Sequence, residues 1–376
     1  MNIVFTCCTD NYPLSFSANN TKDEFIAKGL KDCSITFINR LWGCKNYSSI
    51  TEGETENKYK YYIFPKKSNK LTTVFLNTIS LFKILRKCKK DDEQNIMIID
   101  TGYFIFFIVY IIYAKLLGYK ILHIITEWPL AFKAGTIACL DAQLYVNSFG
   151  YFVDGILPIS EALIEKTKKF KKPTLKTPIL GEYSKNINSQ KGNYFVYCAN
   201  AGYYRIIDFV INAFALYKQN HDNSKLFLVL YGKDVAIKRV RESIKDKHLT
   251  EHIEIVSKLS TEELTQLYAN SIGLLIPLDP NSLQDKYRFS QKIAEYLATK
   301  TPIITCNVGE ISYYLKDKES CIIAEYTIES YAKAMEWIIE NREKAKEIGI
   351  NGYKVGDKNF NYQTYGNQLI KFINQL

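Results

Sequence analysis

The chain has 376 residues, of which 47% are hydrophobic and 23% are charged, and its net charge at neutral pH is +10. This composition places it in the soluble globular class and excludes a disordered or fibrous chain. The length predicts two domains with sizeable cores. The positive charge predicts an anionic partner, namely a membrane, a nucleic acid or a phosphorylated ligand. A nucleic-acid partner is suggested by the net charge and by nothing else, because the chain has no finger, basic helix or aromatic-glycine motif.

The cysteines and the first residues indicate a cellular compartment. Nine cysteines are widely spread, and none forms a Cys-x-x-Cys pair or a cluster with histidine. This predicts reduced thiols in a cytosolic protein and no structural zinc. The chain begins with a strand-like run and no basic region, which predicts that it has no cleavable signal peptide.

The first half of the chain alternates strands with helices. A polar, tyrosine-rich stretch over 42–70 shows little periodicity apart from one short strand, and a loop is expected over 9–20. Alternation of this kind predicts a parallel sheet with helices on both faces. The predicted strands are 2–8, 34–39, 61–64, 96–100 and 119–125, a further short strand lies within 150–160, and the predicted helices are 21–30 and 71–90, with another that Ser160 caps.

Three features of this half have two interpretations each. The apolar run 104–114 is too short to cross a membrane, so it is either a buried helix of the core or a helix lying on a bilayer surface. The basic segments 86–90 and 166–172 are either solvated faces or a patch for anionic lipid. Glu127 follows a strand at its carboxyl end, where ligands bind in open α/β sheets, so it either takes part in the chemistry or forms a salt bridge in the loop.

The second half restarts the alternation after a polar segment at 181–192, where we place the domain boundary. The domains are therefore predicted as 1–182 and 183–357, with a terminal helix from about 358 to 376 crossing back onto the first. Ser260 and Glu263 form a capping box, and a glycine-containing turn is expected near 349–356. The predicted strands are 193–198, 226–231, 252–256, 273–276 and 303–305, and the predicted helices are 207–218, 260–269, 328–341 and 362–376, besides the one that follows Ser290.

The stretch 288–305 is the most informative part of the chain. Ser290 is a suitable N-cap, and Ile293 and Leu297 form one apolar stripe of the helix that follows. Glu295 points away from that stripe. Lys292 in the first turn, beside a helix N-terminus, predicts a site for an anion. The alternative is an ordinary amphipathic helix with a solvated glutamate.

These residues resemble the retaining, GT-B-fold glycosyltransferases of the large family 4 group. Ser290 to Ala298 is similar to the family's Ser/Pro-x-Lys-x-x-Glu-Tyr-Leu-Ala helix, and Thr301-Pro302-Ile303-Ile304 and Asn307-Val308-Gly309 follow as in the family. The loop 197–205 is similar to its phosphate-binding loop. The resemblance covers residues 193–376 well and the first half in outline. It implies a GT-B fold, that is, two Rossmann-like, doubly wound parallel-sheet α/β domains with a cleft between them.

The resemblance also assigns roles. Arg205 matches the second basic residue of the family's phosphate clamp, whose first is replaced here by Asn200. Glu295 matches the second glutamate of the Glu-x7-Glu motif, an acceptor for ribose hydroxyls, whereas Tyr287 stands in place of the first. Glu310 replaces the second glycine of a Gly-Gly pair. The expected catalytic residues are Glu127, Arg205 and Lys292, and the expected nucleotide-sugar-binding residues are Asn200, Arg205, Tyr231, Lys258, Arg288, Phe289, Ser290, Gln291, Lys292 and Glu295, with no metal and no cofactor.

The resemblance implies transfer of a sugar from a nucleotide-diphosphate-sugar to a hydroxyl group with retention. The acceptor is expected to be a glycan or a polyprenyl-diphosphate-linked glycan of bacterial surface polysaccharide synthesis. The expected location is the cytoplasm, either free or peripheral on the inner face of an anionic membrane. Two alternatives stay open on the same fold, namely a nucleotide-sugar epimerase and a non-catalytic sugar-nucleotide-binding subunit.

Overall fold

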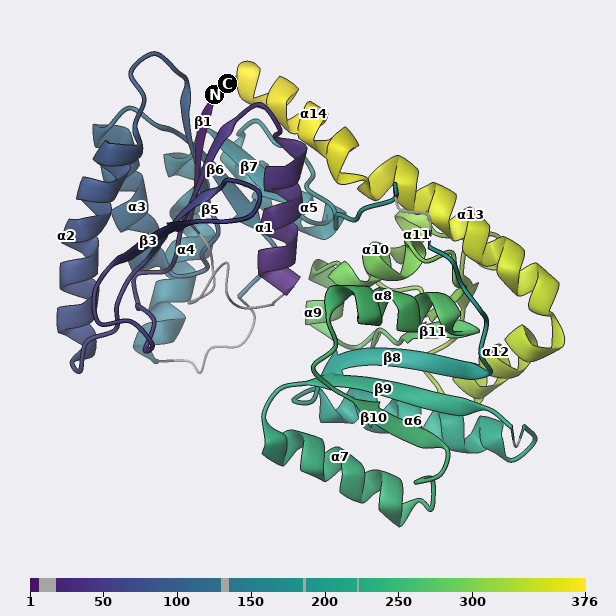
Figure 1. Cartoon of the computed structure of the whole chain (residues 1–376). Coiled ribbons are helices and arrows are strands. Elements are labelled where there is room, and N and C mark those ends of the chain that lie inside the picture. The colour runs from purple at the N-terminus through teal and green to yellow at the C-terminus, as the bar shows by residue number, and fades with distance from the viewer. Residues whose placement is uncertain (7–17, 130–134, 185–186, 222) are drawn as a thin grey trace. The chain divides into compact units, whose positions relative to one another are not determined.

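A computed structural model describes residues 1–6, 18–129, 135–184, 187–221 and 223–376 (Figure 1). The chain forms two compact units. The N-terminal unit consists of Met1–Leu180, Tyr287–Phe289 and Tyr362–Leu376, and the C-terminal unit consists of Gly181–Lys286 and Ser290–Asn361. The last helix therefore belongs to the first unit. Each unit contains one open, essentially parallel sheet, as the sequence predicts.

The N-terminal sheet has the strand order β3-β4-β2-β1-β5-β6-β7. Only the edge strand β3 runs antiparallel to its neighbour; the other pairs are parallel. The strand order reverses between β1 and β5, which makes the carboxyl ends of these two strands the switch point of the sheet. The strands are β1 (Asn2–Thr6), β2 (Ser34–Ile38), β3 (Thr51–Glu54), β4 (Lys60–Ile63), β5 (Asn95–Ile99), β6 (Lys120–Ile125) and β7 (Gly155–Pro158).

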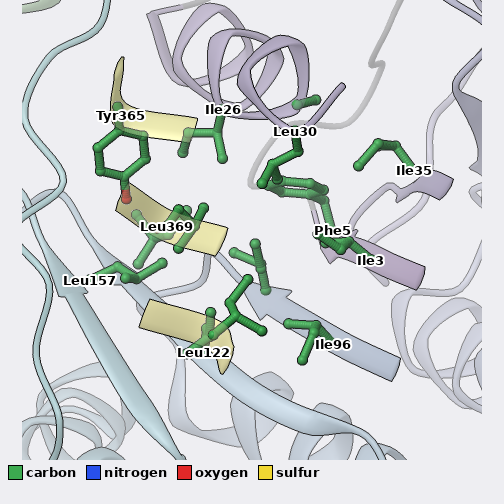
Figure 2. Close-up of a cluster of buried hydrophobic side chains, with 14 of the residues drawn as sticks. Ile3, Phe5, Ile26, Leu30, Ile35, Ile96, Leu122, Leu157, Tyr365 and Leu369 are labelled. Atoms are coloured by element: carbon green, nitrogen blue, oxygen red, sulfur yellow. The ribbon is translucent and has the colours of Figure 1, made fainter. Parts of the chain in front are cut away.

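Helices cover both faces of this sheet, and the alternation of side chains along β6 separates the two faces. Leu122 and Ile124 join the buried cluster that α1 (Ala18–Gly29) and α14 (Tyr362–Asn374) form on one face (Figure 2). His123 points to the other face, where its ring lies 4.9 Å from that of Phe107 and bonds to the hydroxyl of Tyr145. That face carries α2 (Lys70–Cys88), α3 (Phe104–Leu116) and α4 (Ile137–Phe152); α5 (Glu161–Thr167) follows β7.

The C-terminal sheet is wholly parallel, with the order β10-β9-β8-β11-β12-β13. Helix α6 packs against α12 and α7, and α10 packs against α13 and β11. The strands are β8 (Tyr194–Asn200), β9 (Lys225–Tyr231), β10 (Ile253–Val256), β11 (Gly273–Ile276), β12 (Ile303–Thr305) and β13 (Ile322–Ile323). The helices are α6 (Tyr204–Lys218), α7 (Asp234–Asp246), α8 (Thr261–Asn270), α9 (Leu283–Tyr287), α10 (Gln291–Leu297), α11 (Ile311–Tyr314), α12 (Ile328–Glu340) and α13 (Arg342–Phe360).

The predicted turn near 349–356 is wrong, because α13 runs through it without a break. The glycines there serve close packing instead. A Cβ atom on Gly349 would lie 2.3 Å from the carbonyl oxygen of Lys300, and one on Gly352 would lie 2.7 Å from that of Ser320. The elements β3, α4, α7, α11 and β13 were not predicted, and neither was the helix α13 itself. The loop expected over 9–20 runs into helix α1, and most of it lies outside the described residues.

Two capping predictions are confirmed. The hydroxyl of Ser160 accepts from the backbone nitrogen of Leu163 and caps α5. Both hydrogen bonds of the Ser260–Glu263 capping box form at the start of α8. The cysteines in the part of the chain that the structure describes are free thiols. Within that same part, no helix is both long enough and apolar enough to cross a membrane.

Candidate nucleotide-sugar site

The strand order of the C-terminal sheet reverses between β8 and β11, and ligands of open α/β sheets bind at such a point, beside the carboxyl ends of the strands. The loop after β8 is held there by its own hydrogen bonds. The side-chain oxygen of Asn200 accepts from the nitrogen of Gly202 at 2.9 Å, and Ala201 donates to the carbonyl oxygen of Tyr231 at 2.7 Å. Asn200 therefore shapes the loop through its side-chain oxygen, which accepts a backbone hydrogen bond. The basic residue of the family at this position has no such acceptor.

Arg205 lies in the first turn of α6, directly after this loop, and is exposed to solvent. Its charge reaches Tyr326, which follows β13 at the same edge of the sheet. Burial raises the pKa of Tyr326 to about 12, and the positive charge of Arg205 opposes that rise. The Tyr326 ring stacks on Phe209 of α6 at 4.3 Å. Sequence reasoning missed Tyr326, because β13 is only two residues long and gives no strand pattern.

Helix α10 is anchored against the end of β8. The hydroxyl of Tyr296 accepts a buried hydrogen bond from the nitrogen of Cys198 at 3.1 Å, and the hydroxyl of Tyr183 donates to the carbonyl oxygen of Ala294 at 3.1 Å. These anchors fix the rotation of the helix about its axis. They leave Lys292 and Glu295, which are one turn apart, on its partly exposed side.

Lys292, Glu295 and Tyr231 share one electrostatic environment. Burial raises the pKa of Glu295, and the charge of Lys292 lowers it. Burial, followed by electrostatic interaction with Cys198 and with Glu295, raises the pKa of Tyr231 to about 12. Tyr231 is the last residue of β9, so the ends of β8 and β9 meet the exposed side of α10 here. The structure thus brings together three of the predicted site residues.

The remaining predicted residues lie elsewhere or are engaged. Ser290 is the N-cap residue of α10, as predicted, but its side chain makes no capping hydrogen bond. Gln291 is buried. Lys258 is exposed at the end of the edge strand β10, in a left-handed conformation with φ of 61°. Arg288 and Phe289 group with the N-terminal unit.

Tyr287, in the position of the first motif glutamate, also groups with the N-terminal unit. Its carbonyl oxygen accepts from the hydroxyl of Ser160 at 2.5 Å, and the amine of Lys166 lies 5.7 Å from the centre of its ring. Glu310, in place of the second glycine, is buried at the start of α11 with φ of −78°. Since only Gly309 has a positive φ, of 60°, the backbone requires glycine at the first position alone.

Glu127 belongs to the N-terminal unit, two residues after β6, and is exposed. The carboxyl edge of that sheet carries buried charge as well. The amine of Lys22 lies 3.4 Å from a carboxylate oxygen of Asp100 and 3.9 Å from one of Asp23. Asp100 also lines a cavity of about 70 Å³ with Arg40 and Trp42, among others. This edge therefore carries buried ionisable groups beside a small recess.

Two further observations delimit the site. A cavity of about 800 Å³ in the C-terminal unit is lined by residues such as Lys318, Trp337 and Lys344. It adjoins the segment before β13, at the opposite edge of the sheet from Arg205 and Tyr326, so it is not the switch-point site. Among the residues that the structure describes, no group of three or more His, Cys, Asp or Glu side chains is placed to hold a metal ion.

Comparisons with known proteins agree with this geometry. Residues 182–355 match the family model described as glycosyl transferases group 1. The structure of Anabaena HepE in complex with UDP and glucose is similar at a TM-score of 0.75 and 12% identity, covering 100% of this chain and 99% of that one. Sucrose-phosphate synthase from Thermosynechococcus elongatus gives 0.76 and 12%, covering 100% and 98%. The pneumococcal O-GlcNAc transferase GtfA in complex with UDP and GlcNAc gives 0.69 and 10%, covering 100% and 99%.

No curated protein matches the chain by sequence. At these identities the likeness to the solved structures establishes the fold. The match to the family model lies in the C-terminal unit and includes the loop after β8, helix α10 and strand β12. The chain therefore has the GT-B fold, and its residues 182–355 match the model of glycosyl transferases group 1.

Proposed function

We propose that this protein transfers a sugar from a nucleotide-diphosphate-sugar to a hydroxyl group of an acceptor. The observation that carries the proposal is the cluster of Lys292, Glu295 and Tyr231 at the switch point of the C-terminal sheet, which Arg205 extends along the same edge. The solved structures of HepE contain UDP or UDP-glucose, and that of GtfA contains UDP. These ligands support UDP as the first donor nucleotide to test.

In the proposed donor site, positively charged residues bind the diphosphate and a carboxylate binds the ribose. Arg205 and Lys292 neutralise the diphosphate, whose negative charge grows as the bond between sugar and phosphate breaks. A hydrogen bond to a charged group contributes about 1.5–3 kcal/mol, so losing either cation weakens donor binding about tenfold or more. The carboxylate of Glu295 accepts from the two ribose hydroxyls. Asn200 and Tyr231 complete the proposed lining in the C-terminal unit.

Transfer is proposed to proceed with retention and without a metal cofactor. The bond from the anomeric carbon to the leaving phosphate oxygen breaks, and a bond to the acceptor oxygen forms on the same face. The acceptor proton moves to the departing phosphate, so no protein base is needed. Glu127 is proposed to orient the acceptor hydroxyl. If Glu127→Gln leaves turnover unchanged while Glu295→Ala abolishes it, this role of Glu127 is refuted.

The proposed acceptor is a glycan or a polyprenyl-diphosphate-linked glycan, and the reaction is hexosyl transfer in bacterial surface polysaccharide synthesis. The lipid-linked form fits the excess of positive charge, +10 for the whole chain. The proposed place of action is the cytoplasm, at the inner face of the membrane. Incubation with labelled nucleotide-sugar and membrane extract tests this assignment. Label recovered in the lipid extract supports a lipid-linked acceptor, and absence of label from that extract contradicts it.

A second function has a specific observation in its favour. Tyr287 stands where the family has its first motif glutamate, and it groups with the N-terminal unit rather than with Lys292 and Glu295. A chain that binds the nucleotide-sugar without turning it over would tolerate this change. An epimerase on the same fold is the third candidate, but it needs a pair of carboxylates at the sugar.

Thermal shift with UDP, GDP, CMP and ADP and their sugar conjugates tests the donor site. A ligand at about 100 times its dissociation constant adds about 2.7 kcal/mol of stability. We expect one nucleotide to stabilise the wild type but not Glu295→Ala. The control is Glu340→Ala, an exposed glutamate at the end of α12, which should keep the full shift. No shift with any nucleotide would refute the proposal.

Nucleotide release then separates the three functions. A transferase releases nucleotide in proportion to added acceptor, whereas an epimerase interconverts or hydrolyses the donor with no acceptor present. A binding subunit shows the thermal shift and neither reaction. Release that depends on acceptor and is lost in Lys292→Ala supports the first function.

A further inference from the structure

The helical layer α2, α3 and α4 of the N-terminal unit exposes a large apolar surface. Helix α3 packs against α2 on one side and against α4 on the other, and the three lie on the face of the sheet opposite α1 and α14 (Figure 1). Eleven large apolar side chains of these helices are exposed; for example, Ile137 is 87% and Leu71 81% accessible. They are Leu71, Phe75, Leu76 and Ile79 of α2, Ile105, Ile112 and Leu116 of α3, and Ile137, Leu140, Leu144 and Tyr151 of α4.

A surface of this kind requires an explanation. Single exposed apolar residues are ordinary on soluble proteins, but eleven on three neighbouring helices exceed the patches that monomers usually show. The sheet already takes the other side of each helix. In α3, for instance, Phe106, Phe107 and Tyr110 are buried, while Ile105 and Ile112 are exposed. The apolar surface is therefore available to a partner of the protein.

The charge of this layer identifies the partner. Asp141 is the single acidic residue of the three helices, and its carboxylate is used at the start of α3, where it accepts from the nitrogens of Phe104 and Ile105 at 2.9 and 3.1 Å. The cations are not neutralised in this way. Lys70, Lys83, Arg86, Lys87 and Lys115 lie on the same helices and are exposed, and among these Lys87 pairs with Glu52.

A surface that is apolar and cationic but has no free acid fits an anionic bilayer, where apolar side chains enter the headgroup region and cations attract the phosphates. A second copy of the chain fits poorly, because a symmetric contact would bring two cationic faces together and supply no unengaged acid of these helices to pair with them. The basic segments 86–90 and 166–172, first considered for this role, are paired with acids in part: Lys87 with Glu52, Lys89 with Asp91, Lys90 with Glu93 and Lys168 with Glu165. Arg86 and Lys87 of the first segment lie on α2 and belong to the surface described here.

The start of α3 connects this surface with the carboxyl edge of the sheet. Tyr103 and Phe106 line the cavity of about 70 Å³ that Asp100 also lines. The ring of Trp42, another residue of the cavity, lies 4.6 Å from that of Phe106, and the amine of Lys70 lies 4.0 Å from the Trp42 ring. A bilayer under α2, α3 and α4 would therefore adjoin this recess.

We infer that the outer face of α2, α3 and α4, hereafter the docking face, binds an anionic lipid surface and holds the carboxyl edge of the N-terminal sheet beside a lipid-linked acceptor. The inference about the acceptor rests on the proposed glycosyl transfer; the binding to lipid does not. The binding is peripheral, because α3 has 13 residues, whereas a helix needs about 20 to cross a bilayer.

Flotation of the full chain with vesicles at low salt tests the docking face. Vesicles of phosphatidylcholine with phosphatidylglycerol should carry the wild type to the top of the gradient, and vesicles of phosphatidylcholine alone should carry much less. The triple variant Phe75→Ser, Leu116→Ser, Ile137→Ser keeps every charge but should bind at least about tenfold more weakly. The matched control is Val235→Ser on α7, because Val235 is 81% exposed in the other unit.

A charge variant tests the electrostatic part separately. Lys83→Gln, Arg86→Gln, Lys115→Gln should weaken binding about a hundredfold, at about fivefold per charge, and should flatten the salt dependence. Equal flotation of the wild type and both triple variants would overturn the inference. So would a dimer in solution that only the serine variant dissociates, because the face would then be an interface between copies.

The outcomes for lipid and for donor are independent. Vesicle binding is measured without nucleotide, and the UDP thermal shift is measured without lipid. If the wild type floats with anionic vesicles but no nucleotide stabilises it, the docking face stands and the proposed function falls. If UDP stabilises it but the vesicles do not carry it, the docking face falls and the proposed function stands.

Discussion

Replacing Gly366 by alanine should destabilise the N-terminal unit, because two helix backbones cross at this residue. A Cβ atom on Gly366 would lie 2.1 Å from the carbonyl oxygen and 2.6 Å from the Cα of Gly29 in α1. Real Cβ atoms essentially never approach closer than 3.0 Å, so α14 has to move outward by about 1 Å. The movement would loosen the packing of Tyr365, Leu369 and Ile373, which are all buried against the sheet.

The size of the effect follows from two opposing contributions. Overpacking costs about 1–3 kcal/mol, and a clash with backbone lies at the upper end because no side chain can rotate away. Alanine gains about 1 kcal/mol over glycine in a helix, which leaves a net loss of about 2 kcal/mol. With a urea m-value of about 2 kcal/mol/M, the midpoint of the transition of this unit should fall by about 1 M.

Urea unfolding followed by circular dichroism and tryptophan fluorescence measures this shift. The control is Gly102→Ala, since a Cβ atom there has nothing within 4 Å and no positive φ to accommodate. It should change the free energy of unfolding by less than about 0.5 kcal/mol. A Gly366→Ala protein as stable as the wild type would refute the reasoning that the crossing of α1 and α14 depends on glycine.

Three further predictions concern buried polar groups and a helix cap. Burial raises the pKa of Asp23 to about 8, whereas the unfolded side chain titrates near 4, so the free energy of unfolding should fall as the pH rises from about 4 to about 8. Asp23→Asn should flatten this pH dependence in melting curves, and an unchanged dependence would contradict the assignment. Tyr296→Phe removes the acceptor of the buried Cys198 nitrogen and should cost about 1–3 kcal/mol in denaturant unfolding; a neutral effect would show that the bond does not anchor α10. Ser260→Ala should cost about 1 kcal/mol through loss of the cap of α8, and Glu263→Ala less; equal losses would argue against a cap centred on the serine.

Local patterns in the sequence predict much of the architecture. Parallel strands buried on both faces are short apolar runs, and β1, β2, β5, β6 and β9 were found within a few residues for this reason. Helices with a recognisable start, such as α8, were also found. Exposed or short elements were missed, because a polar edge strand such as β3 and a two-residue strand such as β13 leave no periodic signal.

Whether a glycine ends a helix or lets it pack closely is a question that the sequence leaves open. Gly349 and Gly352 are typical of a turn by composition, yet α13 continues through them because Lys300 and Ser320 approach its backbone. The same limit applies to caps. Ser260 and Ser290 have the same side chain before a helix, but only Ser260 has a glutamate three residues later to complete the box.

Spacing along the chain is sufficient to predict the alternating α/β architecture, the family resemblance of the C-terminal half and the placement of Lys292 and Glu295 on one helix. The fold was needed to show that Tyr231 joins these two residues, that Tyr326 lies within the electrostatic influence of Arg205, and that the exposed residues of α2, α3 and α4 lie in one layer. These relations join residues far apart in the chain, and the register of a sheet and the rotation of a packed helix set them.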